Sequence, residues 1–563
     1  MWLLVFICVL AISRAQDPRV NTTQGIIIGR RALDGDYLSF YGIHYAGDTS
    51  GANRFKAPSP APKYPGDYHA IDTDVICAQP SYRGIIGVEN CLMLNVLTKN
   101  LTTPKPVMVW IEGEDYESTS GTLYSFRHLV ESGLVVVSMN YRLSIFGFLC
   151  LGVEEAPGNA GLKDVIQGLQ WIRENIAGFG GDPNNVMLVG HGSAAAMVDL
   201  ITLSPLSNDL VHKALVLSGS ALAPWAVSFK PLESARYVGA KLEYTHKSRS
   251  ELAKLLAGTD LNVLNGVLTD NDFYNASVLF APCVEDVNLN PNETVLSDAP
   301  INILRSGKYS KIPYVAGYTD REGTVRAQQA VLNNWLSKME MNFKDFIQTD
   351  LSFKNDSNKT AVAQEIREFY FAKKTINMDV IEDYLDYHGD VLILIPIMRG
   401  ARERALTSPD NVRLFEYAYR GSHNSDWTYP TIPINGAKHG AILNYLFDFD
   451  LRIGDKTAQE SITKRIVGLA FTGKPFPMDY NATTWDAITP YFMHMLYMSG
   501  SEVADKLTLY KEEMQGNLNQ ERTEFWSKIF DRHYEAPKPV SSAQTLIGFH
   551  VIVLVAQLMT KLL

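Results

Sequence analysis

Short apolar, β-branched runs alternate repeatedly with longer helical patterns along this chain. The runs cover residues 107–111, 134–141, 185–189, 214–220 and 312–318. Between two of them, residues 161–179 place apolar side chains at helical spacing: Leu162, Val165, Ile166, Leu169, Ile172 and Ile176. This alternation predicts an α/β fold, with a large, mainly parallel central sheet and helices on both faces.

No Ser/Gly linker, charge block or internal repeat divides residues 16–540. We therefore predict one large α/β domain over that range. Acidic residues outnumber basic ones by 61 to 51, which gives a net charge of -10. An acidic chain without a basic stripe does not favour nucleic-acid binding, so we expect no nucleic-acid partner.

Both ends of the chain carry targeting patterns. Residues 1–15 form an apolar run that ends in small residues, which predicts a signal peptide cleaved before Gln16. Residues 541–563 start at Ser541 and Ser542 and continue as an apolar tail. This tail predicts either a GPI-attachment signal, with the lipid carried at these serines, or a single membrane span. Either reading tethers the domain to the extracellular face of the plasma membrane.

Other residues agree with the secretory route. Seven N-x-S/T sequons predict glycosylation at Asn21, Asn100, Asn275, Asn292, Asn355, Asn358 and Asn481. Cys77 and Cys91 bracket a short polar loop, and we expect a disulfide there, which closes a loop of about 15 residues. Cys150 and Cys283 lie in apolar surroundings, where we expect buried free thiols.

One segment stands where ligands bind in open α/β sheets. Residues 189–197, VGHGSAAAM, follow a turn and a buried strand and begin an alanine-rich helix. The preceding helix returns the chain to the start of this strand, so Val189 is expected at the carboxyl edge of the sheet, just inside the usual ligand site.

Collinear segments along nearly the whole mature chain resemble the carboxylesterase and cholinesterase family. They include ENCLMLNV at 89–96, PVMVWIEG at 106–113, NYRLSIFGFL at 140–149, FGGDPNNV at 179–186 and GYTDREG at 317–323. The resemblance implies the α/β-hydrolase fold of type-B carboxylesterases. It also implies a catalytic triad in the order nucleophile, acid, base.

The nucleophile position departs from the family pattern G-E-S-A-G. Aligned on FGGDPNNV, this chain has Gly192 where the serine belongs and Ser193 one residue later. A side chain one step along the turn points in another direction, so Ser193 is not expected to replace the nucleophile. By resemblance, Glu322 occupies the acid position and His439 the base position, as remnants of the relay.

The region that binds the oxyanion in the family also departs. Its strand should end in a histidine and successive glycines, but here Gly113 is followed by Glu114 and Asp115, and Ser193 stands at the neighbouring donor position. Added side chains block a carbonyl and carboxylates oppose negative charge. Losing one donor costs about 10² to 10³ in turnover and losing the nucleophile about 10⁶, so ester turnover is expected near background.

Metal and cofactor chemistry is not indicated. Glu112, Glu114, Asp115, His191 and His439 are compatible ligand types, but no tight ligand spacing links them. We therefore expect no metal and no cofactor.

The expected function is extracellular binding or cell adhesion by a catalytically inactive, membrane-tethered domain, with a protein as partner. The chain is similar in this respect to the family's adhesion branch, which includes neuroligins, neurotactin, gliotactin and glutactin and keeps the scaffold without the whole triad. Two alternatives stay open. One is a pocket-based carrier or scavenger of apolar esters or hormones, and the other is an authentic carboxylic ester hydrolase that uses Ser193 or a water activated by His439.

Overall fold

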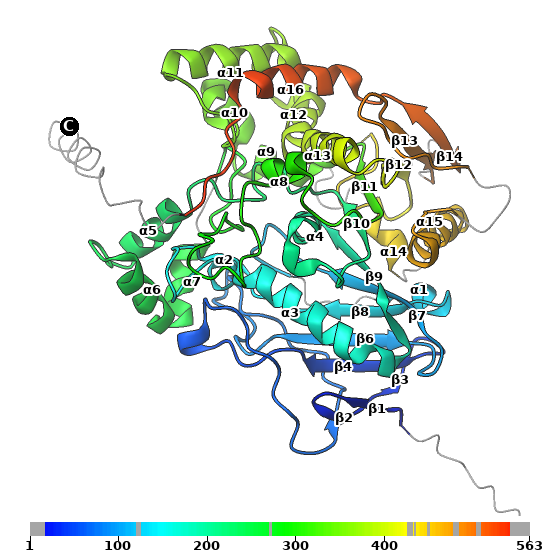
Figure 1. Ribbon diagram of the computed structural model, residues 1–563. Coiled ribbons are helices and arrows are strands. Elements are labelled where there is room, and N and C mark those ends of the chain that lie inside the picture. Colours follow the sequence, from blue (N-terminus) through cyan, green and yellow to red (C-terminus); the bar gives the residue numbers. More distant parts are fainter. Residues whose placement is uncertain are drawn as a thin grey trace, which may run out of the picture.

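The computed structural model contains an eleven-stranded mixed sheet with helices around it (Figure 1). The structure describes residues 17–119, 125–269, 273–424, 432, 435–447, 451–476, 483–502 and 508–540. The predicted signal peptide, the C-terminal anchor with Ser541 and Ser542, and the sequon at Asn481 lie outside these ranges. Within them, no helix has the length and apolar character needed to cross a membrane.

The large sheet places sequence-distant strands side by side. From one edge to the other its order is β14 (Thr508–Gly516), β13 (His494–Ser501), β12 (Val412–Arg420), β11 (Tyr314–Thr319), β10 (Lys213–Leu217), β9 (Gly181–His191), β7 (Lys105–Ile111), β8 (Val135–Met139), β6 (Met93–Thr98), β4 (Leu38–His44) and β3 (Arg30–Arg31). A separate small sheet contains β1 (Arg19–Thr22), β2 (Gly25–Ile28) and β5 (Tyr68–His69).

The central pairings are parallel and the edge pairings are antiparallel. Parallel neighbours run without interruption from β8 through β7, β9, β10, β11 and β12 to β13. The five apolar runs of the sequence become β7, β8, β9, β10 and β11. The predicted mainly parallel α/β sheet is therefore confirmed.

Both faces of the sheet are buried, which explains the continuous apolar runs. Successive side chains of β7 point to opposite faces. Val109 belongs to the core that contains residues of α3 (Ala160–Asn175) and α4 (Ser193–Leu203). Trp110 belongs to the core that contains residues of α1 (Arg127–Glu131), α14 (Leu443–Leu446) and α15 (Ile453–Thr472). The helix predicted at 161–179 is α3 followed by a 3₁₀ turn at Ile176–Phe179.

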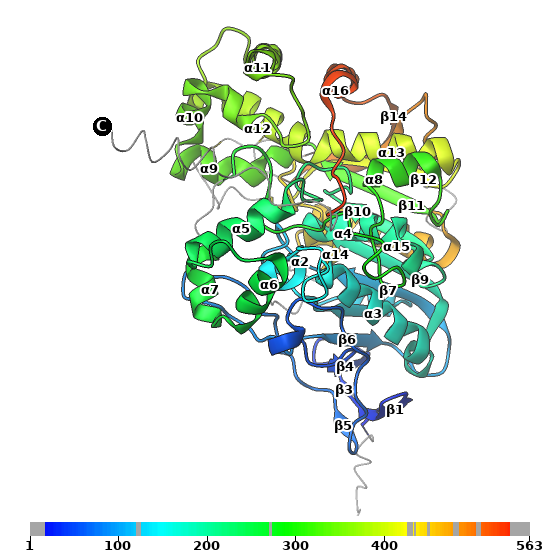
Figure 2. The same cartoon turned by 60° about the vertical axis from the view of Figure 1, so that its left-hand side comes forward.

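The remaining described helices lie on the connections between strands, except the last of them, which follows β14. They are α2 (Ser144–Phe148), α5 (Pro231–Lys241), α6 (Arg249–Gly258), α7 (Leu261–Leu268), α8 (Pro300–Ser306), α9 (Ala327–Leu332), α10 (Trp335–Met341), α11 (Asp356–Phe371), α12 (Ile381–Gly389), α13 (Ile395–Thr407) and α16 (Gln520–His533). Figures 1 and 2 both place α5, α6 and α7 together on one side of the molecule.

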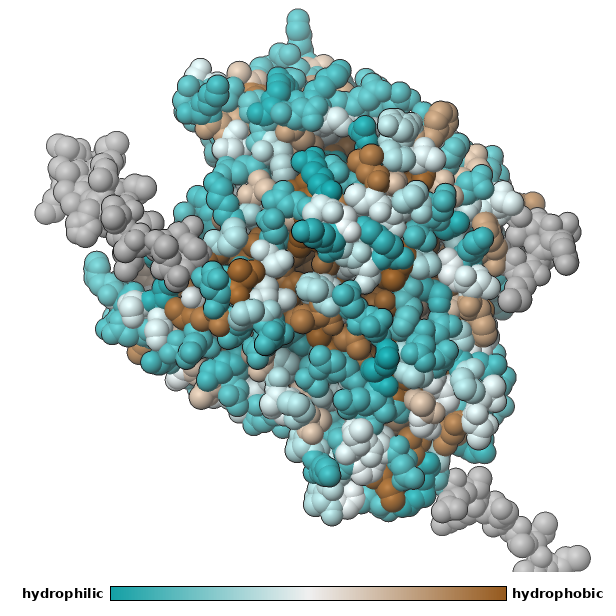
Figure 3. Space-filling model, in the orientation of Figure 1, coloured by the Kyte–Doolittle hydropathy of each residue, from teal (hydrophilic) through white to brown (hydrophobic). Residues whose placement is uncertain are grey.

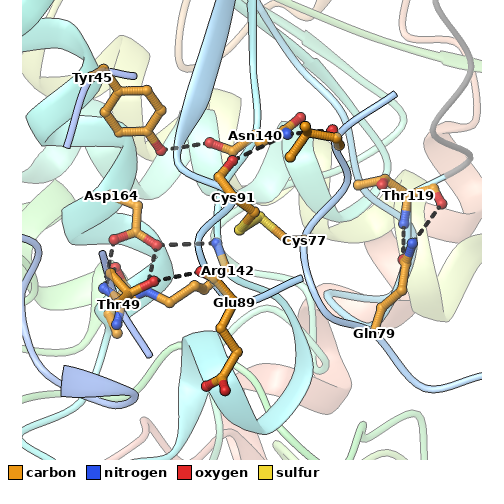
Figure 4. The surroundings of a disulfide bond; sticks show 12 residues. Tyr45, Thr49, Cys77, Gln79, Glu89, Cys91, Thr119, Asn140, Arg142 and Asp164 are labelled. Atoms are coloured by element: carbon orange, nitrogen blue, oxygen red, sulfur yellow. Dashed lines mark hydrogen bonds and ion pairs between the residues drawn. A yellow bond between two sulfur atoms is a disulfide. The ribbon is translucent and has the colours of Figure 1, made fainter. Parts of the chain in front are cut away.

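Two disulfides fix the loops. The predicted bridge between Cys77 and Cys91 is confirmed, and its surroundings are drawn in Figure 4. The prediction of free thiols at Cys150 and Cys283 is wrong, because these residues form a second disulfide across 133 residues of sequence. Apolar surroundings suit a buried disulfide as well as a buried free thiol, so they do not distinguish the two. Val540 packs beside it and donates its backbone N–H to the carbonyl of Val284 at 3.1 Å.

Candidate active-site remnant

The segment 189–197 forms a sharp turn between β9 and α4. β9 ends at His191, α4 begins at Ser193, and Gly192 between them has φ 59° and ψ −124°. L side chains rarely adopt this backbone conformation. At Gly190 an added Cβ would lie 2.6 Å from the carbonyl carbon of Ala194, so the strand end approaches the helix as closely as only glycine allows. The strained turn is present although its apex carries no side chain.

Space for an apex side chain is also present. A Cβ built on Gly192 would have Glu114 Oε2 at 3.8 Å as its one neighbour within 4 Å among the atoms that could obstruct it. That distance is an ordinary van der Waals contact. The position therefore has room for a serine side chain, and the sequence places a glycine there.

The side chain of Ser193 is hydrogen-bonded to the neighbouring loop. Its Oγ donates a hydrogen bond to the carbonyl of Gly113 at 2.9 Å and accepts one from the backbone N–H of Tyr116 at 3.1 Å. The side chain is buried. Ser193 thus ties the start of α4 to the loop that follows β7.

That loop contains a tight turn in place of consecutive glycines. The N–H of Glu117 donates to the carbonyl of Glu114 at 2.8 Å, and the central residues Asp115 and Tyr116 have φ of 50° and 60°. Positive φ at both central positions is typical of a type I′ turn. The N–H of Glu114 donates to the carbonyl of Ser118 at 2.8 Å. This amide, at a position the family uses for an oxyanion donor, is therefore engaged within the loop.

Two contacts hold the turn in place. Tyr116 is fully buried, and its hydroxyl donates to the carbonyl of Ala226 at 3.2 Å. Thr119 and Gln79 exchange two hydrogen bonds, from Thr119 N–H to Gln79 Oε1 at 2.6 Å and from Gln79 Nε2 to the Thr119 carbonyl at 3.3 Å (Figure 4). Gln79 belongs to the loop closed by the Cys77–Cys91 disulfide, so that loop clamps the end of the turn.

The acid and base positions remain linked. Glu322 Oε2 lies 2.5 Å from Nδ1 of His439. The other carboxylate oxygen of Glu322 accepts hydrogen bonds from the Ser218 hydroxyl at 2.6 Å and the Thr319 N–H at 2.7 Å. The backbone N–H of His439 donates to the Thr324 hydroxyl at 2.9 Å. These contacts orient the imidazole as in a catalytic triad, although Gly192 at the apex of the turn offers no hydroxyl to hydrogen-bond with it.

The protonation of the two neighbouring histidines is shifted in opposite directions. Burial disfavours the His439 imidazolium, but the carboxylates of Glu322, Glu114 and Asp115 outweigh it and raise the pKa of His439. The ring of His191 lies 4.7 Å from that of His439. Burial lowers the pKa of His191 well below its ordinary value, and the charge of His439 lowers it further. The raised pKa of His439 therefore reflects its pairing with carboxylates, which stabilise the protonated ring.

Acidic side chains surround the same space. Burial among protein atoms raises the pKa of Glu114, and the neighbouring charges of Asp115 and Glu112 add to this effect against the opposing His439. Burial, helped by the charge of Asp115 and opposed by that of Arg326, raises the pKa of Glu117 to about 7. A developing oxyanion at this place would have carboxyl groups among its neighbours, which oppose negative charge when they are ionised.

The structure brings together most residues that the sequence singled out. Gly113, Glu114, Gly192, Ser193, Glu322 and His439 form one site, with Asp115 close enough to raise the pKa of His439. Among the described residues, no group of three or more His, Cys, Asp or Glu side chains could hold a metal ion. Sequence reasoning missed the anchors Gln79, Ser218 and Thr324, because their partners lie far away in sequence.

The sequons differ in exposure. Asn21, Asn292 and Asn355 are exposed, whereas Asn100, Asn275 and Asn358 are half-buried.

The sheet order, the strained strand-to-helix turn and the acid–histidine pair define a protein with the α/β-hydrolase fold. The structure matches that of juvenile hormone esterase from Manduca sexta, with OTFP covalently attached, at a TM-score of 0.81 and 23% identity, over 92% of this chain and 100% of that chain. The model of the carboxylesterase family matches residues 16–526, and the chain belongs to this family.

Named relatives cover most of the chain. Venom carboxylesterase-6 of Apis mellifera is 27% identical over 91% of this chain and 94% of its own length. Esterase B1 of Culex pipiens is 31% identical over 76% and 82%, and cholinesterase of Mus musculus is 28% identical over 98% and 93%.

Proposed function

We propose that this chain is a carboxylesterase-fold protein of the cell exterior that has lost ester hydrolysis and acts by binding an extracellular protein partner. The observation that carries the proposal is Gly192 at the apex of a strained turn that otherwise retains the geometry for a nucleophile. Strained backbone at a functional site persists when the surrounding structure enforces it. The turn therefore keeps its conformation although the residue at its apex has no hydroxyl.

The hydrogen bonds of Ser193 argue against its use as a substitute nucleophile. Turning its hydroxyl toward His439 breaks its bonds to Gly113 and Tyr116. Leaving a buried donor or acceptor without a partner costs about 1–3 kcal/mol per group. The named relatives are esterases, so this hydrolytic alternative is the one that needs a direct test.

Electrostatics support the same conclusion. An oxyanion near Glu114 and Asp115 would be repelled, and one expected donor, the N–H of Glu114, already bonds to Ser118. The carboxyl groups of Glu114 and Asp115 also make the site a poor carrier pocket for apolar esters or hormones, since an apolar ligand cannot compensate for their lost hydration. We therefore place the binding function on the outer surface of the domain.

Location outside the cell is part of the proposal. It is supported by the predicted signal peptide at 1–15, the predicted anchor at 541–563 and the two disulfides, which are typical of oxidising compartments. A tether at the C-terminus would hold the domain on the extracellular face of the membrane, where adhesion partners meet it.

The test is the turnover of a chromogenic acetate ester by the purified full-length protein. Wild type, Ser193→Ala and His439→Ala are expected to give the same background rate. Gly192→Ser, and the same change combined with Glu114→Gly and Asp115→Gly, measure whether the relay is still aligned. Turnover by wild type that falls on changing Ser193 would overturn the proposal in favour of a hydrolase.

A further inference from the structure

A concave region lies beside α5, and one of its lining residues, Trp225, has its ring 6.1 Å from that of Tyr116 in the active-site loop. It is a groove of about 520 Å³ between α5 and residues 273–281. Four aromatic rings line it, those of Trp225, Phe229, Tyr237 and Phe273. On the face drawn in Figure 3, apolar side chains reach the surface near the centre, between larger polar areas. The volume is within the range of about 300–1,000 Å³ that holds a small organic ligand.

The groove has a polar rim. Lys230 and Glu233 both line it and form an ion pair with each other at 3.1 Å. Aromatic walls with a few polar groups at the edge suit a ligand that has both apolar C–H faces and hydroxyl groups. Carbohydrate has this combination, because a sugar ring presents C–H bonds on its faces and hydroxyls around its edge.

A sequon asparagine belongs to the groove wall. Asn275 lines the groove, and its Oδ1 accepts hydrogen bonds from the Ser277 hydroxyl at 2.7 Å and the Ser277 N–H at 3.4 Å. Both bonds use the amide oxygen, and the amide nitrogen, to which an N-glycan is attached, takes no part in them. The Thr349 N–H donates to the Asn275 carbonyl at 3.0 Å and holds the main chain beside the groove.

We propose that the first sugars of an N-glycan on Asn275 fold into this groove and cover the rings of Trp225, Phe229 and Phe273. The amide nitrogen that carries the glycan and the aromatic wall that binds it then belong to one site. Docking therefore does not cost the translational entropy that a free ligand loses when it binds. The glycan closes the groove to diffusible ligands and makes carbohydrate part of the surface on the α5 side.

Asn292 provides an internal comparison. It is exposed, and the hydroxyl of its sequon residue Thr294 donates to the Asn290 carbonyl at 2.9 Å rather than to the asparagine side chain. A glycan at Asn292 is therefore expected to extend into solvent. The two sites are compared on the same molecule under the same conditions.

The experiment uses the full chain expressed in animal cells through its own leader, with processing blocked so that every glycan is of the high-mannose type. Native protein is treated with endoglycosidase H, and release at each site is followed by glycopeptide mass spectrometry. Release at Asn275 is expected to be slower than at Asn292 by about tenfold or more, which corresponds to about 1.4 kcal/mol in favour of the docked state. After denaturation the two rates should be equal.

Variants separate docking from simple crowding. Phe229→Ser and Phe273→Ser should speed release at Asn275, while Tyr491→Ser, which removes a ring that is 87% exposed and outside the groove, should leave it unchanged. An unoccupied Asn275 would overturn the proposal, as would equal native rates at Asn275 and Asn292. The wild-type comparison decides the matter even where a groove variant fails to fold.

Discussion

Replacing Gly192 by alanine measures the strain stored at the turn. A Cβ at this position meets Glu114 Oε2 at 3.8 Å, so the cost comes from the backbone and not from a clash. A sparsely populated conformation costs about 1–3 kcal/mol, and alanine recovers about 0.4–1 kcal/mol by reducing the entropy of the unfolded chain. We expect Gly192→Ala to lower the free energy of unfolding by about 0.6 kcal/mol at the lower ends of these two ranges and by about 2 kcal/mol at their upper ends.

Urea unfolding followed by tryptophan fluorescence measures this change as a lower midpoint at constant slope. The matched control is Gly266→Ala in α7, where the added Cβ has no neighbour within 4 Å. That change should stabilise the protein by about 0.5–1 kcal/mol, since glycine is unfavourable within a helix. If Gly192→Ala were as stable as wild type, the turn would be unstrained and the inference of a retained nucleophile geometry would fail.

Three further predictions concern contacts elsewhere in the chain. Ser193→Ala should lower the free energy of unfolding by about 1–3 kcal/mol, because Gly113 and Tyr116 lose their buried partner; unchanged urea stability would contradict the assigned hydrogen bonds. Removing the bridge across 133 residues, with Cys150→Ser and Cys283→Ser, should cost about 5 kcal/mol, against about 3 kcal/mol for the bridge across 14 residues; equal losses in thermal unfolding would contradict this order. His388 is buried, which lowers its pKa well below 6.5. Below pH 6.5 the unfolded chain therefore takes up a proton that the folded chain does not. The free energy of unfolding then falls with decreasing pH, by up to about 1.4 kcal/mol per pH unit. His388→Gln should reduce this slope between about pH 6.5 and 5 in urea titrations, and an unchanged slope would count against the assignment.

The architecture was predictable because the signals for it are local. The β-branched runs became β7 to β11, and both faces of these strands are buried, so apolar residues fill consecutive positions. The glycine at 192 could be located for the same reason, since the strand before it and the alanines after it fix the turn.

The parts that the sequence did not predict depend on contacts between distant segments. The pairing of Cys150 with Cys283 and the tilted packing of His191 against His439 each join residues with no shared local pattern. The positive φ of Tyr116 was also unexpected, because tyrosine rarely adopts that conformation and burial of its ring holds it there. Such features arise from tertiary packing, which a local pattern does not encode.

The most direct measurement is covalent labelling of the wild-type protein by a fluorophosphonate, followed by mass spectrometry of the peptide that contains residues 189–203. With glycine at the apex and the hydroxyl of Ser193 bonded to Gly113 and Tyr116, no phosphonate should be found on this peptide. A stoichiometric adduct on Ser193 that is lost when His439 is changed to alanine would contradict the account.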